Sequence, residues 1–201
     1  MSAWLETELE TYERHVELET VGQAAAIRTA IRTAAMQLEP KRFLYLGCAG
    51  GNGLEALPQA RVVGIDLNEK YLAVARERWG QEFLRHDLNQ GLPHLGRFDL
   101  AFGALLFEYI DNLSGLVEDL SKCVDGHLLV MLLATRENAP AVAESLYRKL
   151  LEPVGREFRY LSVERFIETA AEFGFLLEAR EEFSLPAGKH FVSILFKRQL
   201  A

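Results

Sequence analysis

The chain has 201 residues, of which 49% are hydrophobic and 25% are charged, and this composition excludes a fibrous or low-complexity protein. Its formal net charge of -7 argues against nucleic acid as a partner, because a surface that follows phosphates needs clustered lysine and arginine. At this length we expect one domain over residues 1–201.

The sequence predicts a cytoplasmic protein without a membrane segment. No apolar run approaches the roughly 20 residues of a membrane-spanning helix, and residues 1–10 lack the basic and then apolar order of a secretory signal. Cys48 and Cys123 stand far apart without the spacing of metal ligands, so neither a disulfide nor a metal site is expected.

The predicted elements alternate between helix and strand. The first long helix is expected over Val21 to Leu38, with Thr20 as its cap and Pro40 beyond its end. Short apolar runs bounded by glycine and polar residues predict strands at 43–48, 61–66, 82–85, 98–103, 128–133, 175–184 and 190–197. Helices are expected at 69–79, 113–124, 142–151 and 162–173.

This alternation predicts an α/β fold. Its sheet is expected to be doubly wound, mostly parallel and seven-stranded, with helices on both faces and a C-terminal antiparallel hairpin. Residues 1–40 are expected to form a helical lid, 41–134 the cofactor-binding half, and 135–201 an insertion helix, the last helix and the closing hairpin.

Three polar or glycine-rich features follow the first three strands. The segment LGCAGGNG, residues 46–53, allows a close backbone approach to a ligand. Asp66 ends the second strand, nineteen residues beyond Gly47, where nucleotide-binding sheets place an acid that accepts hydrogen bonds from ribose. Asp87 follows the third strand. Because these strand ends meet at one edge of the sheet, the three features outline a site for adenosine.

The motifs LGCAGGNG, GIDLN, RHDL and FDLAFGALLFEYID, together with the closing hairpin, resemble the Rossmann-like class of S-adenosylmethionine-dependent methyltransferases. The resemblance covers residues 41–197. More narrowly, TYERHVELETVGQ, GCAGGNGLE and LLFEY look like a subgroup of small bacterial methyltransferases without an assigned substrate. The resemblance implies S-adenosyl-L-methionine as cofactor, held by Tyr12, Gln23, Gly47, Cys48, Ala49, Gly51, Asn52, Asp66, Leu67, Asp87, Leu88 and Gly103.

The same resemblance places Glu108 and Tyr109 beside the transferring methyl group, with a role for Glu108 as a base if the acceptor must lose a proton. His15 and His190 are weaker candidates for that role. A small-molecule acceptor is expected, and the aromatic residues proposed to line its pocket are Phe107, Tyr109, Tyr147 and Phe158.

Two positions depart from the family pattern. Tyr45 stands where the family has an acid on the first strand, and Ala49 replaces the middle glycine. We interpret Tyr45 as a buried strand residue whose hydroxyl finds a partner.

Two alternatives remain open at this point. GNGLEA, residues 51–56, satisfies a dinucleotide-binding pattern and would indicate an NAD(P)-dependent oxidoreductase, although only 15 residues separate Gly51 from Asp66. A non-catalytic scaffold with a methyltransferase-like fold is the second alternative. The sequence does not identify the acceptor or the oligomeric state.

Overall fold

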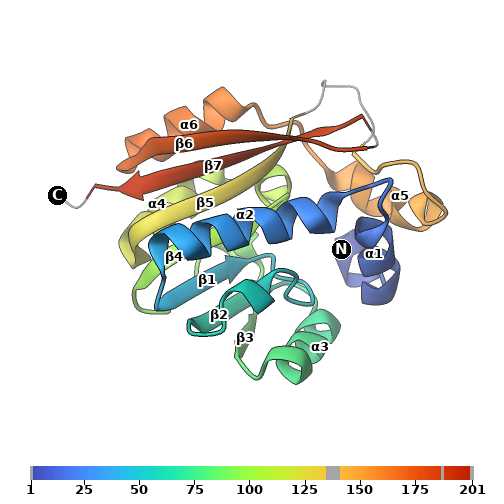
Figure 1. The fold of residues 1–201 in the computed structure, drawn as a ribbon, viewed down its shortest axis with the longest axis horizontal. Coiled ribbons are helices and arrows are strands. Elements are labelled where there is room, and N and C mark those ends of the chain that lie inside the picture. Colours follow the sequence, from blue (N-terminus) through green and yellow to red (C-terminus); the bar gives the residue numbers. More distant parts are fainter. Residues whose placement is uncertain (1, 135–140, 187, 200–201) are drawn as a thin grey trace.

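A seven-stranded sheet runs through the centre of the molecule, with its strands in the order β3-β2-β1-β4-β5-β7-β6 (Figure 1). The computed structural model describes residues 2–134, 141–186 and 188–199. The strands are β1 (Arg42–Leu46), β2 (Arg61–Asp66), β3 (Glu82–Arg85), β4 (Phe98–Ala104), β5 (Val124–Ala134), β6 (Phe175–Ser184) and β7 (His190–Arg198).

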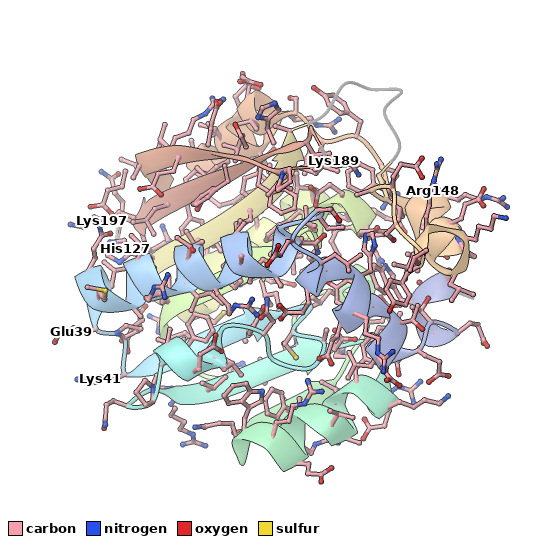
Figure 2. The ribbon with its side chains drawn as sticks, turned by 45° about the vertical axis from the view of Figure 1, so that its right-hand side comes forward. Glu39, Lys41, His127, Arg148, Lys189 and Lys197 are labelled. Carbon is pink, nitrogen blue, oxygen red and sulfur yellow. The ribbon has the colours of Figure 1, made fainter. Side chains whose placement is uncertain are left out.

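The strand directions confirm the expected fold class. The first five strands pair in parallel, whereas β7 is antiparallel to both β5 and β6. In the β5–β7 ladder, His127 lies opposite Lys197, and the two side chains are seen together at one side of the sheet (Figure 2). The last two strands thus form the predicted hairpin.

Six α-helices and four short 3₁₀ turns connect the strands in the described part of the chain. The helices are α1 (Leu9–Glu17), α2 (Gln23–Leu38), α3 (Glu69–Trp79), α4 (Leu113–Cys123), α5 (Arg148–Glu157) and α6 (Val163–Glu172). The turns are η1 (Ala3–Leu5), η2 (Leu54–Ala56), η3 (Leu88–Gln90) and η4 (Phe107–Tyr109). Among the residues described, no helix is long and apolar enough to cross a membrane.

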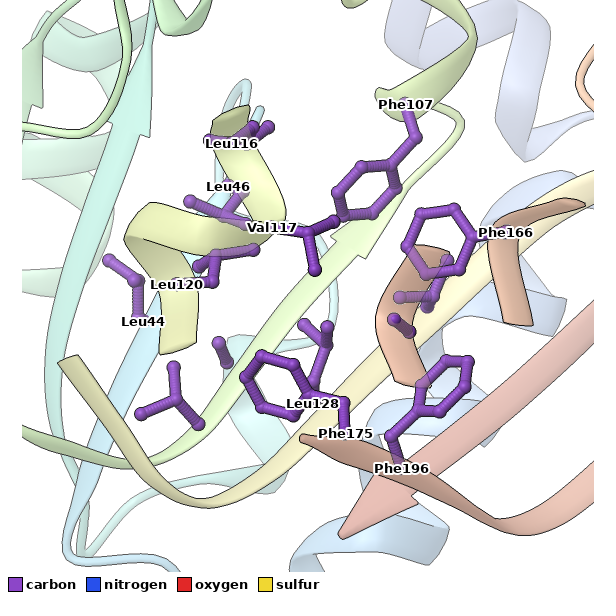
Figure 3. Packing of buried hydrophobic residues seen from close by; sticks show 14 of the residues in the cluster. Leu44, Leu46, Phe107, Leu116, Val117, Leu120, Leu128, Phe166, Phe175 and Phe196 are labelled. Carbon is purple, nitrogen blue, oxygen red and sulfur yellow. The ribbon is translucent and has the colours of Figure 1, made fainter. Parts of the chain in front are cut away.

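Alternating side chains of the strands build a separate core on each face of the sheet. Leu44 and Leu46 of β1 pack on the face covered by α4 and α6, where Phe166 is fully buried (Figure 3). Phe43 and Tyr45, one residue out of phase, pack on the face covered by α2 and α3. Because both faces are covered, the parallel strands read as continuous apolar runs.

Two local predictions were wrong. Helix α2 begins at Gln23, and its N-cap is Gly22 in the left-handed conformation at φ 71°, rather than Thr20. The helix expected at 142–151 is displaced, since α5 spans 148–157 and contains Pro153. Burial of Leu151 and Val154, three residues apart, outweighs the loss of one backbone donor at the proline. Residues 135–140, at the start of the expected insertion, lie outside the described chain.

Candidate functional site

A cavity of about 620 Å³ opens at the carboxyl ends of the parallel strands. It spans the point between β1 and β4 where the order of the sheet reverses, which is the ligand crevice of doubly wound folds. Nine of the predicted site residues line it: Tyr12, Gln23, Gly47, Ala49, Asp66, Leu67, Asp87, Leu88 and Tyr109. The cavity therefore collects residues from α1, α2 and the ends of β1 to β4.

The glycine-rich loop approaches the cavity through left-handed backbone. Gly47 has a φ of 61°, and a Cβ atom there would lie 3.1 Å from Leu106 Cδ1. Ala49 at φ 44° and Leu105 at φ 52° adopt the same conformation although neither is glycine. Gly47, Ala49 and Leu105 all line the cavity. Strained backbone of this kind concentrates at functional sites, because only a constrained loop retains it.

Asp66 joins the glycine loop to the start of α3. Its Oδ2 accepts a hydrogen bond of 2.9 Å from the Ala49 amide, and its Oδ1 accepts one of 2.9 Å from the Asn68 amide. Burial raises the pKa of this carboxyl, and the backbone donors at Asn68, Ala49 and Leu67 counteract the rise. Each oxygen has a second lone pair, so the carboxylate keeps acceptor capacity toward the cavity.

Asp87 combines a local role with its place in the site. Its Oδ1 accepts a hydrogen bond of 3.0 Å from the Asn89 amide, and the residue is the N-cap of η3. Its neighbour Leu88 is buried, and both residues line the cavity.

The N-terminal segment covers one side of the cavity. Gln23 Nε2 donates to the Tyr12 hydroxyl at 3.2 Å. The segment is tied down where Asn68 Nδ2 donates to the Trp4 carbonyl at 2.8 Å and where the Tyr71 hydroxyl donates to the Thr7 carbonyl at 2.8 Å. Helices α1 and α5 lie at the same end of the sheet (Figure 1), and Ser2 Oγ donates to Glu157 at 2.7 Å.

Aromatic rings form another wall. Trp4 meets Tyr12 edge to face at 5.4 Å between ring centroids and meets Tyr109 at 5.7 Å, while Tyr109 meets Phe158 at 5.9 Å. Of the aromatic residues predicted for an acceptor pocket, Tyr109 and Phe158 line this cavity. Phe107 lies in the core with 2% exposure, and Tyr147 is not on the cavity wall.

Sequence reasoning missed Trp4. No spacing relates it to a motif, and it reaches the cavity only because the N-terminal segment folds across the sheet edge.

A smaller cavity of about 270 Å³ shares Tyr12, Gly47 and Ala49 with the larger one. Two more predicted site residues, Cys48 and Asn52, line this smaller cavity. The Cys48 side chain is 1% exposed, and its thiol packs beside Gly64 of β2.

The smaller cavity also contains an ion pair that the sequence did not reveal. Arg28 of α2 donates to Asn52 Oδ1 at 3.0 Å and to Glu17 Oε2 at 2.9 Å. Tyr45 lies on the same cavity, and its hydroxyl donates to the Asn52 carbonyl at 3.0 Å, which confirms its interpretation as a buried residue with a satisfied hydroxyl.

Two of the predicted glycines serve packing instead. At Gly51, with φ 84°, a Cβ atom would lie 2.4 Å from Trp79 Nε1, and at Gly103 it would lie 2.8 Å from the Phe107 ring. Neither glycine lines the larger cavity. Both are needed because a neighbouring ring occupies the space that a side chain would take.

The structure does not place Glu108 on the larger cavity. Its side chain is 1% exposed, and Oε1 accepts a hydrogen bond of 2.9 Å from the Leu133 amide, whereas Oε2 has no partner among the described residues. Burial raises the pKa of this carboxyl to about 7. Glu108 thus holds η4 against the end of β5, and its expected contact with an acceptor has no geometric support.

Comparison with known proteins gives consistent results. Residues 43–126 match the family model described as a methyltransferase domain. The chain is 35% identical over 79 residues to a trans-aconitate 2-methyltransferase of Rhodopseudomonas palustris and 27% identical over 146 residues to one of an Acidovorax species. These alignments cover 37% and 66% of this chain, and only 30% and 56% of the relatives' own lengths.

Solved structures share the fold over nearly the whole chain. A magnesium protoporphyrin IX methyltransferase from Synechocystis, crystallised with S-adenosylhomocysteine, superposes with a TM-score of 0.70. The superposition covers 94% of both chains at 17% sequence identity. At this identity the similarity establishes the fold, and the chemistry must be argued from the site.

Proposed function

We propose that this protein, which has the fold of class I S-adenosylmethionine-dependent methyltransferases and carries a methyltransferase domain at residues 43–126, transfers the methyl group of that cofactor to a small molecule. The observation that carries the proposal is the convergence of the Gly47 loop, Asp66 and Asp87 on one cavity at the switch point of the sheet.

The residues of the cavity fit the cofactor. Asp66 offers carboxylate acceptors to a ribose diol, and Asp87 offers one to an adenine amino group. Gly47 and Ala49 bring bare backbone close to the ligand, and Leu67 and Leu88 add apolar surface for the adenine ring.

Arg28 and Glu17 would bind the methionine end of the cofactor in place of the first-strand acid, which this chain lacks. A guanidinium beside a carboxylate matches a zwitterion, so Arg28 would hold the α-carboxylate and Glu17 the α-ammonium of the methionine end.

Methyl transfer requires little from the protein beyond alignment of the cofactor and the acceptor. The sulfonium of the bound cofactor is an activated methyl donor, and transfer is an in-line displacement. Trp4, Tyr109 and Phe158 would position the acceptor and exclude water. Of the two predicted catalytic residues, Tyr109 lines the larger cavity and Glu108 does not.

The geometry disfavours an NAD(P)-dependent oxidoreductase. The dinucleotide motif opens a long helix whose N-terminus holds a pyrophosphate. Here β1 ends at Leu46, and Gly53 precedes only the three-residue turn η2, so the loop does not open a long helix.

The proposal predicts stabilisation by the reaction product. S-adenosylhomocysteine at about 100 times its dissociation constant should add roughly 2.7 kcal/mol of stability, because it binds only the folded state. For a domain of this size the melting temperature should rise by about 5 to 10 °C. Differential scanning fluorimetry measures the shift, with NAD+ as the comparison ligand. A shift with NAD+ alone would favour an oxidoreductase, and binding of the product without turnover on any acceptor would favour a scaffold.

Arg28→Gln tests the site for the methionine end. We expect affinity for S-adenosylhomocysteine to fall by about tenfold, since a hydrogen bond to a charged group contributes roughly 1.5 to 3 kcal/mol. Affinity for 5′-methylthioadenosine, which lacks the amino-acid end, should stay within twofold. Isothermal titration of both ligands measures the difference, and Arg32→Gln, an exposed position one turn further along α2, is the matched control. Equal losses for both ligands would show that Arg28 only ties α2 to α1.

A further inference from the structure

One wall of the part of the larger cavity not assigned to the cofactor is apolar and aromatic. The rings of Trp4, Tyr109 and Phe158 stand edge to face along it. Aliphatic residues complete this wall: Leu133, Val142, Leu151 and Val154. Such a surface suits a flat aromatic ring, because edge-to-face contacts add to the free energy of burying apolar area.

The acceptor side of the cavity offers no surplus positive charge to a polyanionic acceptor. Apart from Asp66 and Asp87, which are assigned to the cofactor, its lining includes two carboxylates, Asp111 and Glu157, and two arginines. Both arginines are engaged, since Arg156 donates to Glu152 at 2.9 Å and Arg159 pairs with Asp111. A tricarboxylate would therefore find no arginine in this lining that is not already paired with a carboxylate.

His15 is a titratable group on this acceptor side that has a ring nitrogen free of hydrogen bonds among the described residues. It stands on α1 one turn after Tyr12, is 4% exposed and lines the cavity. Its Nδ1 lies 2.8 Å from Ser145 Oγ, and the same oxygen accepts a hydrogen bond of 3.0 Å from the Tyr147 amide. No other described group hydrogen-bonds the imidazole ring, so its Nε2 is left for a ligand.

The surroundings keep this imidazole uncharged at neutral pH. Burial and the nearby ammonium of Lys189 lower the pKa of His15 below its ordinary value of 6.5. Lys189 comes from the loop between β6 and β7, and its Nζ donates to the Ala141 carbonyl. Burial and the positive charge of Arg148 lower the pKa of Lys189 to about 8. Elsewhere on the cavity lining, the carboxylate of Glu157 accepts hydrogen bonds from Ser2 Oγ and the Ala3 amide.

We propose that the acceptor is an aromatic hydroxyl compound and that His15 is the general base that takes its proton. The inference rests on the proposed methyl transfer. The hydroxyl oxygen forms a bond to the methyl carbon as the bond between sulfur and that carbon breaks. The electron pair of the broken bond stays on sulfur. The hydroxyl proton moves to His15 Nε2, and the imidazolium, held through Nδ1 by Ser145 Oγ, returns the proton to water.

The test measures methyl transfer from isotopically labelled cofactor to catechol and 2-naphthol, with trans-aconitate as the carboxylate comparison. We expect the wild-type protein to methylate a phenolic oxygen and His15→Gln to lower kcat by about 10² to 10⁴-fold. Affinity for S-adenosylhomocysteine should stay within twofold. The wild-type kcat should rise with pH through the lowered pKa of His15 and then level off, and the variant should lack this rise.

His190→Gln is the matched control, because His190 also lies beside a serine, with Nδ1 at 3.2 Å from Ser184 Oγ, but is exposed and away from the cavity. It should behave as wild type. His15→Ala should regain part of its rate with added imidazole, which a purely structural role would not allow. Methylation of trans-aconitate but of neither phenol, or loss of rate in His15→Ala without rescue, overturns the inference. Failure to bind S-adenosylhomocysteine would instead overturn the proposed function.

Discussion

Between pH 5 and pH 8, the free energy of unfolding of the wild-type protein is expected to fall by about 3 kcal/mol more than that of Glu108→Gln. Burial raises the pKa of this carboxyl from 4.5 to about 7 in the folded protein. Between these two values the unfolded chain releases its proton and the folded chain retains it, so the free energy of unfolding falls as pH rises. Between the two pKa values, the free energy of unfolding falls by roughly 1.36 kcal/mol for each pH unit.

Thermal unfolding at pH 5 and pH 8 measures the effect. The wild-type melting temperature should drop by about 6 to 12 °C more than that of Glu108→Gln, at roughly 2 to 4 °C per kcal/mol. The glutamine oxygen still accepts from the Leu133 amide, and the cost of its unpaired amide group does not depend on pH. Glu172→Gln, at an exposed position of α6, is the matched control. Parallel pH profiles for wild type and Glu108→Gln would contradict the buried, proton-retaining carboxyl.

Asp66→Ala is expected to weaken binding of S-adenosylhomocysteine by about 100-fold, or roughly 2.7 kcal/mol. The carboxylate is the acceptor proposed for the ribose hydroxyls, and it also holds the Ala49 amide that shapes the glycine loop. Isothermal titration against S-adenosylhomocysteine and its 2′-deoxy form separates the two roles. The wild type should lose affinity for the deoxy form, whereas Asp66→Ala should bind the two ligands equally.

Asp99 provides a control with a similar structural role. Its Oδ2 accepts hydrogen bonds from the Lys41 and Arg42 amides at 2.8 and 2.7 Å, at the opposite end of the sheet from the cavity. Asp99→Ala should therefore cost stability and leave affinity for S-adenosylhomocysteine within twofold. If both variants lost affinity equally, Asp66 would act through general stability and the ribose site would be misplaced.

The order of elements was predictable because the central parallel strands β1, β2, β4 and β5 are largely buried. The predicted bounds of β2, β3 and β6 agree with the structure. For β2, a buried apolar run that ends at a charged residue leaves little freedom in where the strand begins and ends. The displaced α5 shows the limit of local reasoning. Pro153 argues for an end to the helix, and only the buried faces of Leu151 and Val154 outweigh it.

For the site, the motif positions predicted that Gly47, Asp66 and Asp87 lie at one edge of the sheet. The structure brings the three to one cavity, because parallel strands bring their carboxyl ends to a common edge. They did not distinguish a side chain that faces this cavity from one that faces the core. Glu108 and Tyr109 are neighbours in sequence, yet η4 turns the first toward the Leu133 amide and the second toward Trp4. Side-chain direction in a short turn depends on what packs against it.

The sequence by itself determined the doubly wound sheet and the edge of that sheet where a nucleotide-like ligand would lie, because hydrophobic periodicity and strand-end glycines and acids are local signals. Only the tertiary structure decided what surrounds that edge. Trp4, His15 and Arg28 reach the two cavities from the N-terminal segment and α2, through contacts between residues far apart in the chain. No local pattern encodes such contacts, because they depend on how the N-terminal helices pack across the completed sheet.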